Sequence, residues 1–130
     1  MKKHPLLFAT IFAAVSICLI GCNNPPAKVD ATGALDQSFQ QATPEVKQAI
    51  QSVNTSLRAG NYVGAINAMN PIIRGALTDA QKKAIGLELQ QINQAIAANP
   101  TLDSAEFYKQ RQELFNRVYS APKLKFFGGS

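Results

Sequence analysis

The chain has 130 residues, enough for one small domain, and its 13 Lys and Arg against 8 Asp and Glu give a formal net charge of +5 at pH 7. These charges are few and spread along the sequence, so we expect no nucleic-acid partner. The single histidine, His4, and both cysteines, Cys18 and Cys22, lie near the N-terminus. The rest of the sequence therefore lacks the side chains of the usual zinc sites and of Cys/His nucleophile pairs.

The first 21 residues have the layout of a signal peptide. A basic segment with Lys2, Lys3 and His4 precedes an uncharged, apolar run over residues 6–20. A helix that crosses a bilayer needs about 20 consecutive apolar residues, and this run stops short at Gly21. The pattern favours a cleaved signal peptide over a retained membrane span.

The apolar run ends in Leu19-Ile20-Gly21-Cys22, which resembles the lipobox of bacterial lipoproteins. The resemblance implies that the chain is cut before Cys22, that the Cys22 thiol is acylated, and that the acyl chains anchor the protein in a membrane. Asn23 follows, whereas an aspartate at this position resembles the inner-membrane retention signal of proteobacterial lipoproteins. The expected location is therefore the cell envelope, on the outer membrane facing the periplasm if the host has one. An ordinary secretory signal and an uncleaved anchor are the alternatives.

Removal of residues 1–21 changes the chemistry open to the mature chain. His4 leaves together with two lysines, so 109 residues remain and the net charge falls from +5 to +3. With Cys22 acylated, the mature chain has no free thiol, disulfide or imidazole. We therefore predict no catalytic residue, no metal site and no cofactor, and we expect that the protein is not an enzyme. Glu106 and Glu113 remain as an acid and base pair, but Glu106 is also placed to cap a helix.

Residues 22–42 are interpreted as the lipidated cysteine and a flexible tether. Pro25, Pro26 and many small or polar residues occupy positions 23–42, without a sustained hydrophobic period. Fully extended, these residues would reach at most about 70 Å. The spacing of Leu35 and Phe39 leaves open a short turn of helix that packs on the domain.

The helical domain is predicted over residues 43–120, and its first helix begins at Thr43-Pro44-Glu45. Thr43 can cap the helix, Pro44 has no amide hydrogen to leave unpaired, and Glu45 lies near the positive end of the helix dipole. Gly60 is expected to end this helix in a left-handed conformation. The apolar stripe consists of Val46, Ile50, Val53 and Leu57.

The second predicted helix covers about residues 61–74, and the third begins at Thr78. Pro71 interrupts the second helix, which either kinks or ends near Asn70 and resumes as a short turn. The inward face of this helix consists of Tyr62, Ala65, Ile66, Met69 and Ile73. Thr78 and Gln81 fit a capping box for the third helix. That helix carries the stripe Ile85, Leu89, Ile92 and Ile96.

The fourth predicted helix begins at Asp103, with Glu106 completing a second capping box, and closes before Pro122. No alternating, β-branched run typical of a strand occurs in the sequence from 43 to 120. The fold class is therefore all-α, with about four antiparallel helices arranged as two helical hairpins. Both a small bundle and a tetratricopeptide-like stack fit this pattern.

Residues 58–66 resemble the centre of a tetratricopeptide repeat. Four residues match the glycine, aromatic, small and aliphatic positions of that pattern: Gly60, Tyr62, Ala65 and Ile66. The match covers one unit of about 34 residues, whereas a solenoid needs about three repeats. It implies a single helical hairpin and leaves recognition by a groove open.

The candidate binding residues lie on the fourth helix. One broad arc of this helix carries Phe107, Tyr108, Arg111 and Phe115. In one interpretation the aliphatic part of the Arg111 side chain packs on the aromatic rings, and its guanidinium reaches solvent or a carboxylate such as Glu88. In the other, Arg111 contacts an anion or a peptide carboxylate of a partner.

The C-terminal tail, residues 121–130, mixes two lysines with Leu124, Phe126 and Phe127. Docking on the bundle, disorder, and contact with a membrane or a partner all stay open for it. The leading functional hypothesis is a non-catalytic helical protein-interaction module, anchored in the envelope membrane, with a protein partner of unknown identity. The alternative is a structural or ligand-binding envelope lipoprotein that holds a polyanion, a peptide or an apolar molecule.

Overall fold

A computed structural model describes residues 27–120, so the predicted signal peptide, Cys22 and the tail at 121–130 lie outside the described part of the chain. The described residues form five α-helices and two short 3-10 helices, without a strand. In chain order these are α1 (Thr32–Ser38), α2 (Pro44–Arg58), α3 (Tyr62–Met69), η1 (Ile72–Arg74), α4 (Asp79–Ala98), η2 (Pro100–Leu102) and α5 (Ala105–Tyr119). The all-α prediction is confirmed, with one helix more than the four expected.

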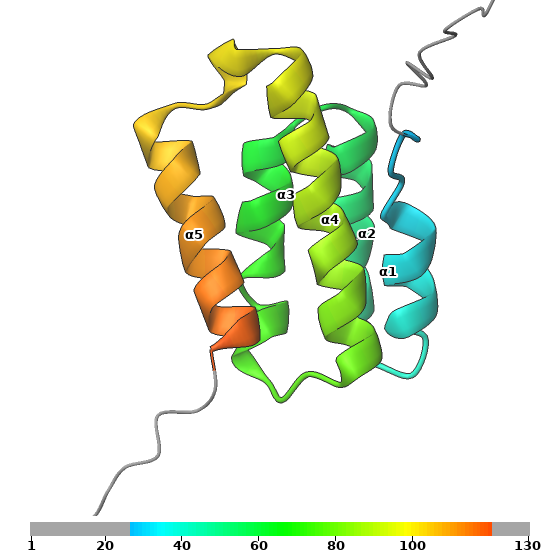
Figure 1. Cartoon of the computed structure of the whole chain (residues 1–130). Coiled ribbons are helices and arrows are strands. Elements are labelled where there is room, and N and C mark those ends of the chain that lie inside the picture. Colours follow the sequence, from blue (N-terminus) through cyan, green and yellow to red (C-terminus); the bar gives the residue numbers. More distant parts are fainter. Residues whose placement is uncertain (1–26, 121–130) are drawn as a thin grey trace, which may run out of the picture.

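The helices lie side by side in one bundle (Figure 1). As predicted, α2 and α3 form one hairpin and α4 and α5 form the other. α4 contacts α1 on one side and α5 on the other, while α1 also contacts α2 and α5 also contacts α3. We call the end of the bundle that holds residues 27–31, the α2–α3 turn and η2 the upper end. α5 finishes at the opposite, lower end (Figure 1).

The predicted starts of α2 and α4 are confirmed because local side chains satisfy the first amides of each helix. Thr43 Oγ1 accepts from Val46 N at 3.5 Å. Thr78 and Gln81 form the full capping box, in which Thr78 Oγ1 accepts from Gln81 N at 3.2 Å and Gln81 Oε1 accepts from Thr78 N at 2.9 Å. At the end of α2, Gly60 has a φ of 71°, a left-handed conformation that glycine adopts at little cost.

The start of α5 differs by one residue from the prediction. Ser104, not Asp103, is the N-cap, and Ser104 Oγ accepts from Phe107 N at 3.2 Å. Asp103 instead directs its carboxylate to Arg111. The two acceptor residues are adjacent in the sequence, and η2 comes directly before them.

Pro71 ends the second predicted helix rather than kinking it. α3 stops at Met69, and the chain resumes after Pro71 as the short helix η1. This confirms the second of the two alternatives, and its cause is the missing amide hydrogen of proline. Ile72, which η1 places in the core, is buried.

The predicted tether folds in its C-terminal half, which corrects the boundary at residue 43. α1 lies within the predicted tether, and Ala31, Leu35 and Phe39 are buried in the common core. Thr32 donates from its hydroxyl and its amide to Asp30 Oδ1, at 2.7 and 3.0 Å, and these hydrogen bonds hold the pKa of Asp30 below its usual value. Residues 27–42 therefore belong to the folded unit, and the remaining predicted tether, residues 22–26, lies outside the described residues.

One hydrophobic core runs through the bundle. The stripes predicted for α2, α3 and α4 supply most of it, and α1 and α5 close it from either side. The buried hydrophobic residues are Ala31, Leu35, Phe39, Ile50, Val53, Leu57, Ala65, Ile66, Met69, Ile72, Ala84, Ile85, Leu89, Ile92, Phe107, Leu114 and Val118. Within residues 27–120, none of the helices combines the length and the apolar character that a bilayer crossing needs.

Candidate functional site

The exposed aromatic surface of the described chain is concentrated on α5. Phe107 of the predicted site is buried, whereas Tyr108, Phe115 and Tyr119 are 53%, 50% and 43% exposed. The remaining exposed large hydrophobic residue in the described range is Val63, at 44% on α3. We call Tyr108, Phe115 and Tyr119 the α5 aromatic face. Tyr108 and Phe115 belong to the predicted arc, and Tyr119 joins them in the structure.

Arg111 is held within the bundle and is not free for an external anion. Its Nη2 lies 2.6 Å from Asp103 Oδ1, and its Nη1 donates to Asn93 Oδ1. The guanidinium carbon also lies 5.4 Å from the centroid of the Phe107 ring and 5.6 Å from that of Tyr108. The side chain is 12% exposed. Arg111 thus stacks on the aromatic rings, as predicted, but pairs with Asp103 rather than with Glu88.

A groove of about 490 Å³ runs between α4 and α5, and we call it the α4–α5 groove. α4 contributes Gly86, Leu89, Gln90 and Asn93, and α5 contributes Arg111, Gln112, Phe115 and Tyr119. Two members of the α5 aromatic face therefore form one wall of this groove. Phe115 and Tyr119 lie against each other, with ring centroids 4.9 Å apart and planes tilted by 40°.

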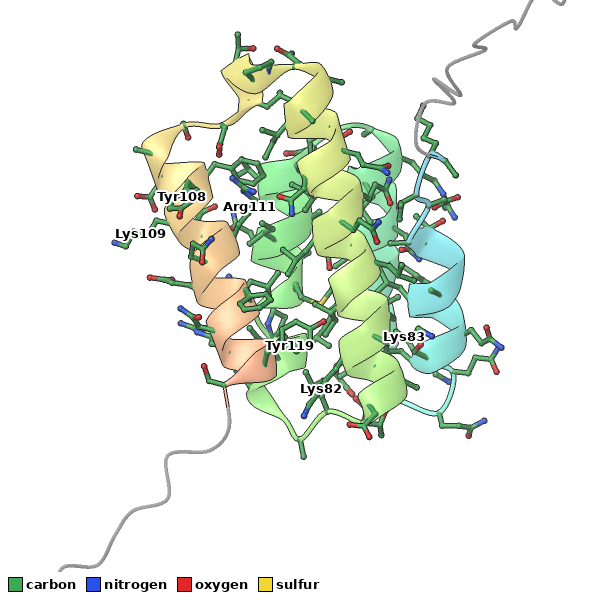
Figure 2. All side chains as sticks on the ribbon, viewed as in Figure 1. Lys82, Lys83, Tyr108, Lys109, Arg111 and Tyr119 are labelled. Carbon is green, nitrogen blue, oxygen red and sulfur yellow. The ribbon has the colours of Figure 1, made fainter. Side chains whose placement is uncertain are left out.

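Tyr119 closes the lower part of this groove by reaching across to α4 (Figure 2). Its hydroxyl donates to the carbonyl oxygen of Lys82 at 2.8 Å, and partial burial raises the pKa of the phenol. The hydroxyl passes Gly86 so closely that a Cβ at this position would lie 2.5 Å from it. Gly86 therefore makes room for the contact between the two helices.

A second groove lies at the upper end, where the described chain begins. Its volume is about 630 Å³, and we call it the entry groove. The lining residues are mainly apolar, and they come from the entering segment, from α3, and from the α4–η2 region: Lys28, Val29, Tyr62, Gln91, Gln94, Ala95, Ala97, Ala98, Asn99 and Leu102. Sequence reasoning did not find this groove, because residues 27–31 had been assigned to a tether.

Glu88 is the most unusual polar residue of the core. Its side chain is fully buried on α4, and neither carboxyl oxygen has a hydrogen-bond partner among the described residues. Burial raises the pKa of Glu88 to about 8, so the group is mostly neutral at pH 7. The sequence contained a signal for this burial, because Glu88 lies three residues after Ile85 and four before Ile92 in the core stripe.

The described residues offer no arrangement typical of catalysis or metal binding. No group of three or more His, Cys, Asp or Glu in this part of the chain is suited to hold a metal ion. Glu106 and Glu113 both lie exposed on α5, and Glu106 accepts a hydrogen bond from Gln110 at 3.5 Å. The predicted lipidation residue, Cys22, lies outside the described residues.

Among the described residues, the α5 aromatic face with its groove and the entry groove are thus two candidate surfaces for recognition. Comparison with protein-family models, with curated proteins and with solved structures finds no match for this chain.

Proposed function

We propose that the protein is a lipid-anchored helical module of the bacterial cell envelope that binds another protein through the α5 aromatic face. The observation that carries this proposal is the gathering of Tyr108, Phe115 and Tyr119 on one helix, with a groove beside them. Aromatic residues are enriched at protein interfaces because they bury a large area at a low cost in side-chain entropy. The module is non-catalytic in this proposal.

The anchor is the second part of the proposal and rests on the lipobox resemblance of residues 19–22. Acylation at Cys22 holds the folded unit at a membrane and restricts its search for a partner to that surface. The resemblance of residues 58–66 to a tetratricopeptide hairpin is compatible with a role in recognition.

The alternative is an envelope lipoprotein that holds a polyanion, a peptide or an apolar molecule. A polyanion site at Arg111 has little support, because Asp103 and Asn93 already occupy the guanidinium. A protein partner fits the aromatic groups better, since the α5 aromatic face remains about half exposed among the described residues despite its contacts with Arg111, with Lys82 and between its own rings.

The anchor is tested by labelling cells with an alkynyl palmitate analogue. The unmodified protein and the Cys18→Ser variant should both carry the label, because Cys18 belongs to the predicted signal peptide. The Cys22→Ser variant should lose the label and appear either in the soluble envelope fraction or as an unprocessed precursor. Labelling and normal membrane retention of Cys22→Ser would refute the anchor.

The partner surface is tested by a photoreactive residue at Gln112, which is exposed and lines the α4–α5 groove. In cells this position should form one dominant protein adduct. Replacing Tyr108 and Phe115 together with alanine should abolish the adduct, whereas Val63→Ala, which removes an exposed hydrophobic side chain elsewhere, should leave it intact.

A control position distinguishes this adduct from random collision. Thr55 is exposed on α2, away from α5, and a photoreactive residue there should not give the same adduct. Equal adducts from both positions would contradict the proposal. Capture of cell-wall or lipid material without protein would favour the ligand-binding alternative.

A further inference from the structure

The segment at which the described chain begins is fixed to the bundle by two glutamines of α4. Gln94 Oε1 accepts from Val29 N at 2.9 Å, and Gln94 Nε2 donates to the carbonyl oxygen of Ala27 at 3.1 Å. Gln91 Oε1 accepts from Ala31 N at 2.9 Å. These side chains satisfy backbone groups of a segment that belongs to neither a helix nor a strand. Residues 27–31 therefore follow α4 at the upper end instead of leaving the bundle.

This attachment leaves a short link to the proposed lipid anchor. Five residue steps separate Cys22 from Ala27, and covalent geometry limits them to about 18 Å when fully extended. α4 alone, with 20 residues, is about 30 Å long. The upper end therefore stays close to the lipid headgroups, whereas the lower end can stand well away from them.

The surface at the upper end suits a lipid bilayer. Val29, Ala95 and Leu102 give the entry groove an apolar lining. Tyr62 and Lys28 lie at the same groove, and tyrosine rings and lysine side chains with a polar tip favour the headgroup region. A lysine near the surface also attracts anionic lipid phosphates. The apolar groove therefore suits the acyl chains of lipids, and the tyrosine and the lysine beside it suit the interface and the headgroups.

We propose that the lipid-anchored protein stands on its upper end, with the entry groove in contact with bilayer lipid. This inference rests on the proposed acylation of Cys22. In this orientation the bundle axis makes a steep angle with the membrane plane. The lower end, with Lys82 and Lys83 (Figure 2), then faces away from the bilayer. The competing arrangement is one in which these two lysines draw the lower end onto an anionic surface.

The test uses the full lipidated protein in vesicles of phosphatidylethanolamine and phosphatidylglycerol. An introduced cysteine is the one free thiol of the mature chain, because Cys22 is acylated and Cys18 has been removed. A fluorophore is attached at one of two exposed positions, Ala98→Cys at the upper end or Arg74→Cys in η1 at the lower end (Figure 1). Lipids brominated along the acyl chain then quench any fluorophore at the membrane.

Quenching at position 98 should be several-fold stronger than at position 74. Replacing both Gln91 and Gln94 with alanine should reduce this difference, because it frees residues 27–31 and lengthens the link. The matched variant Gln90→Ala changes an exposed glutamine of the same helix and should preserve the difference.

Two kinds of failure are distinguishable. Protein that does not float with the vesicles contradicts the acylation and, with it, the orientation. Protein that floats but is quenched equally at both positions, or more strongly at position 74, overturns the orientation alone.

Discussion

Glu88 places an ionisable group at the centre of the bundle. A carboxylate without partners in an apolar core is strongly disfavoured, so the group takes up a proton and its pKa rises to about 8. In the unfolded chain the pKa of a glutamate is about 4.5. Between these two values the folded state binds one proton more than the unfolded state, and its stability therefore depends on pH.

We predict that the free energy of unfolding falls as the pH rises from about 4.5 to about 8. The contribution of Glu88 to the free energy of unfolding is fully present below about pH 4.5 and is lost as the pH rises to about 8. The limiting slope of this loss is about 1.4 kcal/mol per pH unit. Urea titrations at several pH values measure this slope. Glu88→Gln, which cannot titrate, should lack this component. An unchanged slope in Glu88→Gln would mean that another group causes the dependence.

Gly86 and Tyr119 form a second pair whose coupling is measurable. Alanine at position 86 gains helix propensity, about 1 kcal/mol over glycine, but its Cβ would meet the Tyr119 hydroxyl. Tyr119 would then have to give up its hydrogen bond to Lys82, which is worth roughly 1 kcal/mol. The two effects nearly cancel in the protein with Tyr119.

We expect Gly86→Ala to be close to neutral in that protein and to stabilise the Tyr119→Phe variant by about 0.5 to 1 kcal/mol. The phenylalanine lacks the oxygen atom that the new methyl group meets. Thermal or urea unfolding of the four proteins in this cycle gives the coupling energy. Equal effects of Gly86→Ala in both backgrounds would contradict the close approach.

The sequence predicted which residues form the aromatic arc, but not which group neutralises the charge of Arg111 within it. Arg111 was expected to reach solvent or a carboxylate such as Glu88, and it pairs with Asp103, eight residues earlier in the chain. The choice of Asp103 depends on the path of η2, which a helical periodicity does not contain. Tyr119 and Gly86 are distant in sequence, so their approach could be found only from the packed helices.

At the scale of elements, local signals predicted α2 and α4 well because their caps involve residues three apart in the sequence. α1 was left open because seven residues give less than two full helical turns of periodicity. Long-range contacts stabilise this helix, such as the hydrogen bond from Asn54 Nδ2 to Asp36 Oδ1 at 2.7 Å. Such contacts have no counterpart in a local pattern.

We predict that Leu35→Ala destabilises the protein by about 2–5 kcal/mol, the cost of removing a fully buried leucine from a core. Gln37→Ala, at an exposed position of the same helix, should change the free energy of unfolding by less than about 0.5 kcal/mol. Urea denaturation measures both. A small effect of Leu35→Ala would show that α1 behaves as a tether after all.

At the scale of the whole molecule, the buried hydrophobic residues of the described part of the chain lie between residues 31 and 118. If the α5 aromatic face is free to bind a partner, as proposed, deletion of residues 121–130 should change the free energy of unfolding by less than about 0.5 kcal/mol. A loss of about 1 to 3 kcal/mol, the burial of one or two large apolar side chains, would show instead that the tail covers the α5 aromatic face. The proposed partner surface would then be occupied by the protein itself.

The glutamine contacts of residues 27–31 also set the order in which the bundle assembles. They join positions 60 to 67 residues apart in the chain, whereas each hairpin closes through a connection of a few residues. Closing a long loop costs more chain entropy than closing a short one, and contacts distant in sequence slow folding. The two hairpins should thus form first, and α1 should dock last, although ribosomes complete it first. Until α4 exists, Leu35 and Phe39 can pack on α2 but not on the completed core, so the earliest part of the domain to be synthesised is the last to become fully protected from proteases.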